Sequence, residues 1–393
     1  MLCVINLIVG GEFNNPYLKC SLFEAAELKI LKEDYISKNR IYWRRINMTK
    51  IGCPYGTHRV IEPQGVLPQP AWKIDNTMEI YDNELLIEVD TLNIDAASFT
   101  QIKKGAQNDI AVMERMMLDI VEKRGKHHNP ITGSGGMLMG TVSKIGPAWT
   151  GNVPVKVGDR IATLVSLSLT PLKIRKIRKI NTEKEQVEVD AQAILFSSGI
   201  YAVLPLDMSP SLALAILDVA GAPAQTAHLV RPGQNVLIIG GGGKSGMLCL
   251  YEAKKRAGVT GRVIGIGSSK GSCDRMRHLG YADEVLQVDA TDPLQVMKAV
   301  SEVTNGQMVD VTINCVNIPN TEMASIMATK DRGTVYFFSM ATSFTGAALG
   351  AEGIGKDVTM LVGNGYCRNH AIVALETVRE SPILWQVFHE LYA

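Results

Sequence analysis

The sequence predicts an α/β protein in which a mostly-β domain precedes a doubly wound parallel sheet. Residues 57–200 consist of short alternating apolar and polar runs broken by Gly and Pro, as in antiparallel sheets. From residue 233 onward, strand-like runs alternate with helix-like runs, which is the signature of a parallel sheet. The chain has 393 residues, enough for two domains of roughly 100–200 residues each.

The composition excludes several classes of protein. Lys plus Arg total 40 and Asp plus Glu total 39, and this near-balance predicts binding to neither nucleic acid nor an anionic membrane. No apolar run approaches the roughly 18–20 residues that span a bilayer, and residues 1–10 lack the basic flank of a signal peptide. The seven cysteines form no C-x-x-C pair, which predicts reduced thiols, a cytoplasmic location and no local structural zinc site.

Residues 1–47 differ in character from the rest of the chain, with weak periodicity and no glycine after Gly11. The pair Arg44-Arg45 could be encoded AGG-AGG, a bacterial ribosome-binding sequence placed just before Met48. We therefore expect translation to start at Met48 and residues 1–47 to be non-native or poorly ordered. The alternative is a genuine N-terminal extension with a helix at 22–37.

The first domain is expected to span residues 48–205. Strands are predicted in three places: 84–90, 139–145 and 160–165. Residues 173–188 predict a hairpin around Asn181 whose alternating Lys and Arg side chains form a solvated face rather than a binding patch. A helical segment is expected near 210–220.

The second domain is expected to span residues 206–365, with a final helix and a short tail after it. Apolar runs predict strands at 236–239, 262–266, 284–288, 309–315, 333–339 and 357–362. Helices are predicted at 245–257, 273–279, 293–303, 321–327 and 369–379. The repeated order of strand and helix favours a parallel sheet with helices on both faces.

A glycine-rich segment between the first strand and the first helix of this domain carries the strongest functional signal. It fits G-x-G-x-x-G, a pattern that places a pyrophosphate on free N–H groups at a helix N-terminus. The residues expected at the phosphates are Gly241, Gly243, Lys244, Ser245 and Gly246. A nucleotide-binding P-loop is excluded, because it needs a glycine where Ile238 stands.

The next strand would end at Gly267, where dinucleotide-binding domains usually place an acid for the adenosine ribose. Here Ser268, Ser269 and Lys270 follow instead. With no carboxylate to repel a 2′-phosphate, we expect NADP to be accepted alongside NAD; the alternative for Lys270 is a simply solvated side chain. Because ligands bind beyond the carboxyl ends of parallel strands, we also expect four residues near the nicotinamide: Ser339, Met340, Gly363 and Asn364.

Two segments, Gly158-Asp159-Arg160-Ile161 and the run 231–238 before the glycine loop, resemble the medium-chain dehydrogenase/reductase superfamily. The resemblance implies a GroES-like catalytic domain (48–205, with 366–393 packing back on it) and a Rossmann domain (206–365). Zinc-dependent members place a Cys ligand about where Asp95 stands, and a Gly-His-Glu where this chain reads Gly135-Gly136-Met137. We therefore expect no catalytic zinc.

A narrower resemblance covers residues 52–73, which read GCPYGTHRVIEPQGVLPQPAWK. This segment is similar to the opening of the L-erythro-3,5-diaminohexanoate dehydrogenase family, and the similarity runs from Met48 to the C-terminus. It implies NAD(P)-dependent oxidative deamination of that diamino acid to 5-amino-3-oxohexanoate and ammonium in anaerobic lysine fermentation. It also implies a homodimer.

Such a substrate carries two amino groups and one carboxylate, so its pocket needs at least one carboxylate and one cation. Asp95 is the first candidate to bind the amine or act as general base, with a capping or turn Asp as the alternative. Arg59 is the candidate to hold the substrate carboxylate, Glu62 the distal ammonium, and His58 to relay protons, although a lone His is more often structural. Two other functions remain open: a zinc-free NADP-dependent carbonyl or enone reductase, and a non-catalytic NAD(P)-binding sensor.

Overall fold

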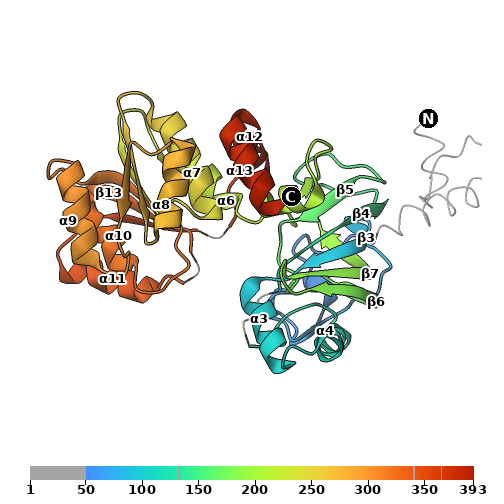
Figure 1. Cartoon of the computed structure of the whole chain (residues 1–393). Coiled ribbons are helices and arrows are strands. Elements are labelled where there is room, and N and C mark those ends of the chain that lie inside the picture. The colour runs from blue at the N-terminus through green and yellow to red at the C-terminus, as the bar shows by residue number, and fades with distance from the viewer. Residues whose placement is uncertain (1–49, 132, 134, 340, 364) are drawn as a thin grey trace, which may run out of the picture. The chain divides into compact units, whose positions relative to one another are not determined.

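The computed structural model (Figure 1) describes residues 50–131, 133, 135–339, 341–363 and 365–393. The expectations for residues 1–47, for the start at Met48, and for Met340 and Asn364 lie outside the described residues. The chain forms two compact units. The first comprises the described residues up to Gly158 together with Val165–Gly199, and the second comprises Asp159–Leu164 and Ile200–Ala393.

The first unit is built on an antiparallel sheet with the strand order β6-β7-β3-β4-β5-β8, whose last two strands group with the second unit. Its strands are β3 (Glu84–Asn93), β4 (Met137–Ile145), β5 (Arg160–Thr163), β6 (Leu172–Asn181), β7 (Gln186–Phe196) and β8 (Tyr201–Val203). A small separate sheet pairs β1 (Val60–Glu62) with β2 (Lys73–Ile74), after the short 3-10 helix η1 (Thr57–Arg59). Strands β6 and β7 form the predicted hairpin, with Asn181 facing Gln186.

Strand β3 shows how sequence alternation produces this sheet. Leu85, Ile87 and Val89 are buried on one face, as a period of two requires. The register then shifts between Val89 and Thr91 in the pairing with both neighbours, so that Leu92 continues the buried face. The shift is a β-bulge, and it lies just before the strand ends at Asn93.

Two helices interrupt the region that the sequence predicted to be strand-like throughout, so that prediction was wrong there. They are α3 (Ala96–Gly105) and α4 (Ile110–Arg124). Each begins at an aspartate whose carboxylate accepts backbone N–H bonds: Asp95 from Ser98, and Asp109 from Ala111 and Val112. Helix α4 ends at Gly125, which has a φ of 72°. An N-cap Asp and a C-cap Gly are sequence signals that favour a helix.

The second unit contains the predicted doubly wound parallel sheet, with the order β11-β10-β9-β12-β13-β14. The strands are β9 (Asn235–Ile239), β10 (Arg262–Gly267), β11 (Glu284–Gln287), β12 (Val309–Asn314), β13 (Thr329–Phe337) and β14 (Thr359–Val362). The helices between them are α7 (Lys244–Ala257), α8 (Lys270–Leu279), α9 (Pro293–Val303), α10 (Glu322–Ala328) and α11 (Phe344–Gly353). Counted along the chain, the order is 3-2-1-4-5-6, which is that of the Rossmann fold.

The helices cover both faces of this sheet (Figure 1). Alternate residues of β9 enter different cores: Val236 and Ile238 pack with residues of α7 and α8, whereas Leu237 and Ile239 pack with residues of α9 and α10. A run of successive apolar residues, such as 236–239 of β9, is expected where a parallel sheet is buried on both faces. The predicted strands and helices of this sheet are confirmed, while α11 was not predicted.

The remaining helices of the second unit are α5 (Pro210–Leu217), α6 (Gly221–Leu229), α12 (His370–Glu380) and α13 (Pro382–Tyr392). The expected single helix near 210–220 is thus two, and the expected C-terminal tail is a helix. The segment 366–393, which was expected to pack on the first domain, groups with the second unit, where α12 contacts α5, α6 and α7. Among the described helices none alone has the length and apolarity to cross a membrane; α5 and α6 reach them only as a pair bent by 47°.

Candidate functional site

The glycine loop of the second unit joins the end of β9 to the start of α7. Its backbone turns at Gly240, which has a φ of 82°, and α7 begins after the N-cap residue Gly243. A Cβ atom on Gly246 would lie 2.1 Å from the carbonyl oxygen of Gly240. Only glycine therefore allows the first turn of α7 to pack so closely on the loop.

The N-terminus of α7 has the features of an anion site. Within the described part of the chain no side chain caps it, whereas the neighbouring helix α8 is capped by the hydroxyl of Ser269. The first N–H groups of a helix need partners, and the helix dipole places positive charge there. The loop and helix therefore fit the pyrophosphate of a dinucleotide, which would bring acceptor oxygens to these groups.

A cavity of about 310 Å³ opens beside this loop, within the second unit. It lies where the ends of β9, β10 and β12 meet, which is the topological switch point of the sheet. Ligands of open α/β sheets bind in this position. Its lining includes Gly240, Gly243, Gly267, Ser268, Asp289 and Asn317.

The expected cofactor residues fall into different places around this cavity. Gly243 and Ser268 line it. Lys244 forms an ion pair with Asp218 at 2.6 Å, and Lys270 pairs with Asp274 while its side chain stays 83% exposed.

Four other expected residues lie elsewhere around the loop and the sheet. A Cβ on Gly241 would lie 2.5 Å from the sulfur of Met276, and Ser245 is buried in the first turn of α7. The hydroxyl of Ser339 donates to Oδ1 of Asn317 at 3.4 Å, and Asn317 lines the cavity. Gly363 packs against Tyr336.

Two charged residues near the glycine loop and the cavity were not among the expected cofactor residues. Asp289 lines it, and its carboxylate accepts hydrogen bonds from the N–H and hydroxyl of Thr291, bonds that lower the pKa of Asp289. Arg275 donates to the carbonyl oxygen of Gly242 at 2.5 Å. The available signal for Asp289 was its place just after a strand, at the edge of the sheet where ligands bind.

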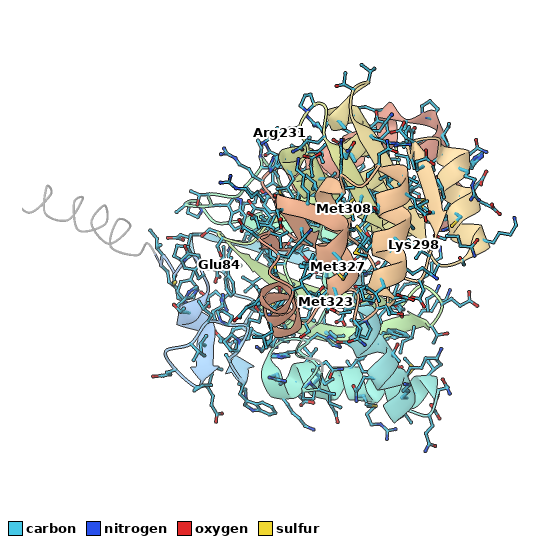
Figure 2. All side chains as sticks on the ribbon, turned by 90° about the vertical axis from the view of Figure 1, so that its left-hand side faces the viewer. Glu84, Arg231, Lys298, Met308, Met323 and Met327 are labelled. Atoms are coloured by element: carbon cyan, nitrogen blue, oxygen red, sulfur yellow. The ribbon has the colours of Figure 1, made fainter. Side chains whose placement is uncertain are left out.

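In the first unit, Arg59 and Glu84 form a buried ion pair at the start of β3 (Glu84 is labelled in Figure 2). The guanidinium donates to both carboxylate oxygens at 2.7 Å, and both residues are 1% exposed. Nε2 of His58 contacts the same carboxylate at 2.8 Å. Burial alone would raise the pKa of Glu84, but the hydrogen bonds from Arg59 and His58 bring it down to about 2.

This cluster occupies the polar atoms that were expected to bind substrate. Arg59 also donates to the backbone carbonyls of Thr77 at 3.0 Å and Glu79 at 2.8 Å. His58 uses its second nitrogen to accept from the N–H of Cys53. The geometry favours a structural role for both residues, because their donors and acceptors are already used. Glu62 lies exposed on β1.

Asp95 has the capping role that the sequence left open as the alternative, and one of its carboxylate oxygens stays unused. Its Oδ1 caps α3 by accepting from the N–H of Ser98 at 2.9 Å. Its Oδ2 is buried and has no hydrogen-bond partner among the described residues. The same holds for both ring nitrogens of His127, a residue that is 0% exposed and that sequence reasoning missed.

Gly135 and Gly136 stand where zinc-dependent members place a glycine and a histidine ligand, and both lie close to backbone of neighbouring segments. Gly136 has a φ of 92°, and a Cβ there would lie 2.0 Å from the carbonyl oxygen of Asn93. A Cβ on Gly135 would lie 2.3 Å from the carbonyl oxygen of His127. A histidine ligand at 136 has no room, and among the described residues no group of three His, Cys, Asp or Glu side chains could hold a metal ion.

A further group of basic side chains lies next to His127 along the chain. Lys126 is fully buried and donates to the carbonyls of Pro68 at 2.5 Å and Gln69 at 2.8 Å. Burial, with a contribution from the charge of Arg124, lowers the pKa of Lys126 to about 7. Arg124 stacks on Trp72 and donates to its carbonyl.

Comparison with known proteins identifies relatives of this chain. Two family models match: the L-erythro-3,5-diaminohexanoate dehydrogenase N-terminal domain over residues 58–205 and the zinc-binding dehydrogenase domain over residues 246–365. Among solved structures, a mycobacterial quinone oxidoreductase is 18% identical with a TM-score of 0.48, covering 82% of this chain and 86% of its own. A Pseudomonas syringae pv. tomato quinone oxidoreductase is 19% identical with a TM-score of 0.49, covering 81% and 83%.

Curated relatives resemble the chain much more strongly. L-erythro-3,5-diaminohexanoate dehydrogenase of Acetoanaerobium sticklandii is 57% identical over 341 residues, which cover 87% of this chain and 99% of the relative. The enzyme of the same name from Fusobacterium nucleatum is 58% identical over 343 residues, with the same two shares. The resemblance seen at residues 52–73 is confirmed, and the chain belongs to the L-erythro-3,5-diaminohexanoate dehydrogenase family.

Proposed function

We propose that this chain catalyses the NAD(P)-dependent oxidative deamination of L-erythro-3,5-diaminohexanoate to 5-amino-3-oxohexanoate and ammonium. The observation that carries the proposal is the 57% identity to a dehydrogenase of that name along 99% of its length. The cavity beside the glycine loop supports it, because it offers a dinucleotide the backbone of Gly243 and the N-terminus of α7.

The reaction makes a definite demand on the protein. A nicotinamide cofactor held at the glycine loop would supply the acceptor for the hydride that leaves C3 of the substrate. C3 can release this hydride only after its ammonium group, with a pKa of about 10, has lost a proton, because the developing iminium would otherwise place a second positive charge on nitrogen. Water then replaces the nitrogen, so that one substrate, one oxidised cofactor and one water give ketone, ammonium, reduced cofactor and a proton.

Asp95 is our candidate for the group that holds the C3 ammonium and takes its proton. Its carboxylate is fixed at the start of α3, and Oδ2 has no hydrogen-bond partner among the described residues. It therefore retains an acceptor that a donor can use. Arg59 and His58 are less suited, since their polar atoms contact Glu84 and the backbone.

We propose that both NAD and NADP are accepted. No carboxylate follows Gly267 directly, and Lys270 stands exposed near the start of α8, which favours a 2′-phosphate. The carboxylate of Asp289 lines the cavity and opposes a phosphate. Lys270 favours NADP and Asp289 favours NAD, so the ratio of the rates with NADP and with NAD measures which charge has the larger effect.

The test is to mix purified protein with L-erythro-3,5-diaminohexanoate and either NAD or NADP, following reduced nicotinamide by absorbance and ammonium by a coupled assay. Equal amounts of both products support the proposal. Turnover of neither cofactor, with cofactor binding intact, contradicts it and directs attention to carbonyl and enone substrates.

A matched control is Gly243→Asp. The position has a φ of −83° and room for a Cβ, whose nearest contact is 3.4 Å away. Asp is also a favoured N-cap residue. We therefore expect the variant to fold and to lose cofactor binding, because its carboxylate enters the phosphate cradle.

We also propose that the protein is a cytoplasmic homodimer that acts in anaerobic lysine fermentation. Support for the dimer and the pathway comes from the resemblance at residues 52–73 alone, and support for the location from the unpatterned cysteines. Light scattering of the purified protein tests the dimer, and a monomer would contradict it.

A further inference from the structure

Two cysteine side chains of the second unit contact each other beside the cavity at the glycine loop. Cys249 lies on α7, and Cys315 directly follows β12, 66 residues further along the chain. Their sulfur atoms are 3.8 Å apart. Of the five cysteines in the described part of the chain, these two are the pair whose thiols meet. Two thiols in contact are the starting point of a disulfide bond.

Backbone and core contacts hold both segments next to the glycine loop. The N–H of Cys315 donates to the carbonyl oxygen of Ile239 at 3.0 Å, which places it beside the last residue of β9. Cys249 lies on the second turn of α7, the helix that follows the glycine loop. Its side chain packs in the same core as Val236 and Ile238 of β9. The thiol pair therefore connects the helix expected at the pyrophosphate to the switch point of the sheet.

The two thiols differ in their access to the cavity. Cys315 is partly buried and lines the cavity of about 310 Å³. Cys249 is 0% exposed, and burial together with the neighbouring thiol raises its pKa well above the ordinary value. A small reagent that enters the cavity therefore meets Cys315 first, whereas Cys249 stays protonated behind it.

Cys273 shows how the same unit satisfies a thiol that has no thiol partner. It lies on α8 and is as deeply buried as Cys249. Its sulfur contacts the backbone carbonyl oxygens of Gly267 at 3.6 Å and Leu286 at 3.8 Å. Burial in this sheet therefore does not require a thiol to face another thiol. The contact between Cys249 and Cys315 is a separate feature, and Cys273 is its natural control.

We propose that Cys249 and Cys315 are a peroxide-sensitive thiol pair, whose oxidation to a disulfide weakens binding of the dinucleotide. The sulfur of Cys315 attacks hydrogen peroxide, the O–O bond breaks, and a sulfenic acid and one water form. The sulfur of Cys249 then attacks that sulfur: the S–S bond forms, the S–O bond breaks, and the hydroxyl leaves as water with the thiol proton. Two thiols and one peroxide thus give one disulfide and two waters.

The bond changes the cavity because it requires movement. A disulfide holds its two sulfurs about 2 Å apart, so thiols that are 3.8 Å apart must approach each other. In a close-packed interior this displaces α7, the end of β12 or both. We expect the Kd for NADH to rise about tenfold, and by linkage bound cofactor must oppose formation of the bond to the same extent. This consequence rests on the proposed function, whereas formation of the bond does not.

Mass spectrometry of the oxidised protein tests the pair directly. Wild-type protein is treated with hydrogen peroxide and digested without reduction. We expect a linked pair of peptides that contain Cys249 and Cys315, formed about tenfold more slowly when NAD is saturating. After the peroxide is removed, nicotinamide fluorescence should give the weaker Kd for NADH, and dithiothreitol should restore the original value.

Three variants separate the pair from other thiols. Cys273→Ala is the matched control and should form the linked peptides at the wild-type rate. Cys249→Ala should instead stop at the sulfenic acid of Cys315, which dimedone labels, while wild-type protein takes up little of this label. In Cys315→Ala, peroxide should leave that variant's own Kd for NADH unchanged. Should a variant fail to fold, the linked peptides and the Kd of the wild type decide alone.

The outcomes distinguish this inference from the proposed function. Absence of the linked peptides from peroxide-treated wild-type protein overturns the inference, whatever the protein binds. Linked peptides with an unchanged Kd for NADH overturn its effect on the cofactor. If the bond forms and NAD slows it, but the reduced protein does not turn over the diamino acid, the inference stands and the proposed function falls.

Discussion

Two carboxylates of the first unit, the buried Glu84 and the half-buried Asp95, differ in how many hydrogen bonds the fold gives them. Glu84 accepts hydrogen bonds from Arg59, His58 and the N–H of Tyr81. Asp95 accepts one bond, and its second oxygen has no hydrogen-bond partner among the described residues. Taking a charge out of water costs several kcal/mol, and full pairing offsets that cost. The comparison separates a carboxylate whose oxygens are fully paired within the fold from one that keeps an unused acceptor.

The same comparison changes the role assigned to Arg59, which lies in the segment 52–73 that carries the family resemblance. Arg59 stands in that segment and was the expected partner of the substrate carboxylate. In the structure it instead ties this segment to the start of β3 and to the loop that holds Thr77 and Glu79. A residue in a characteristic motif can thus serve folding, and only the count of its occupied donors reveals this.

The largest effect is expected from breaking the satisfied cluster. Arg59→Met should lower the free energy of unfolding by about 3–5 kcal/mol, because it leaves Glu84 buried without a counter-charge. Urea denaturation measures this. Arg59→Met/Glu84→Gln should recover part of the loss. If Arg59→Met is instead stable and raises KM for the diamino acid, Arg59 binds substrate and the comparison fails.

Acid tests the same cluster without a mutation of Arg59. The pKa of Glu84 is about 2 in the fold, below its ordinary value of about 4.3. The stability that it contributes is therefore fully present above pH 4.3 and is lost as pH falls toward 2, about 3 kcal/mol in all. Glu84→Gln should remove this part of the pH dependence; an unchanged acid transition would contradict the assignment.

The unsatisfied carboxylate should respond in the opposite way, with a large effect on catalysis and a small one on stability. Asparagine is as good an N-cap as aspartate, so Asp95→Asn should change the free energy of unfolding by less than about 0.5 kcal/mol. We expect kcat/KM to fall about 100-fold, equivalent to about 2.7 kcal/mol of transition-state stabilisation.

The N-cap of α4 provides the control for this variant. Asp109 caps that helix in the same manner as Asp95 caps α3, but it is exposed. Asp109→Asn should leave both the free energy of unfolding and kcat/KM unchanged. If Asp95→Asn behaves in the same way as Asp109→Asn, Asp95 is a helix cap and nothing more.

The sequence predicted the second unit well because its signals are local. Each apolar strand is followed by a glycine or polar turn and then by an amphipathic helix, so the sheet and the glycine loop can be inferred from short windows. Helix α4 was missed in the first unit, although Met113, Met117 and Val121 repeat at the helical spacing and are buried. The region was predicted to be strand-like because the sequence on both sides of this helix alternates as strands do.

The candidate site was predicted less well, for a different physical reason. Asp95 could be singled out from its position, but its neighbour His127 lies on another segment, brought close by the packing of Gly135 and Gly136. Likewise, the donors of Arg59 are consumed by Glu84. Spacing along the chain states neither which residues meet across the fold nor which polar atoms remain unused.

The smallest expected effect concerns Lys126, a buried lysine of the first unit. It is fully buried, and its ammonium donates to two backbone carbonyls. Its pKa is about 7 in the fold, below the ordinary value of about 10.4. The unfolded chain therefore binds more protons between these two values, and the contribution of Lys126 to stability must rise with pH across that window.

We expect Lys126→Met to change the free energy of unfolding by about 1 kcal/mol at pH 7, because two carbonyls lose a donor while a buried charge is also removed. The difference between wild type and variant should shift in favour of the wild type from pH 7 to pH 9. Urea denaturation at the two pH values measures it. A difference that stays the same from pH 7 to pH 9 would mean that Lys126 remains fully charged in the fold over this range.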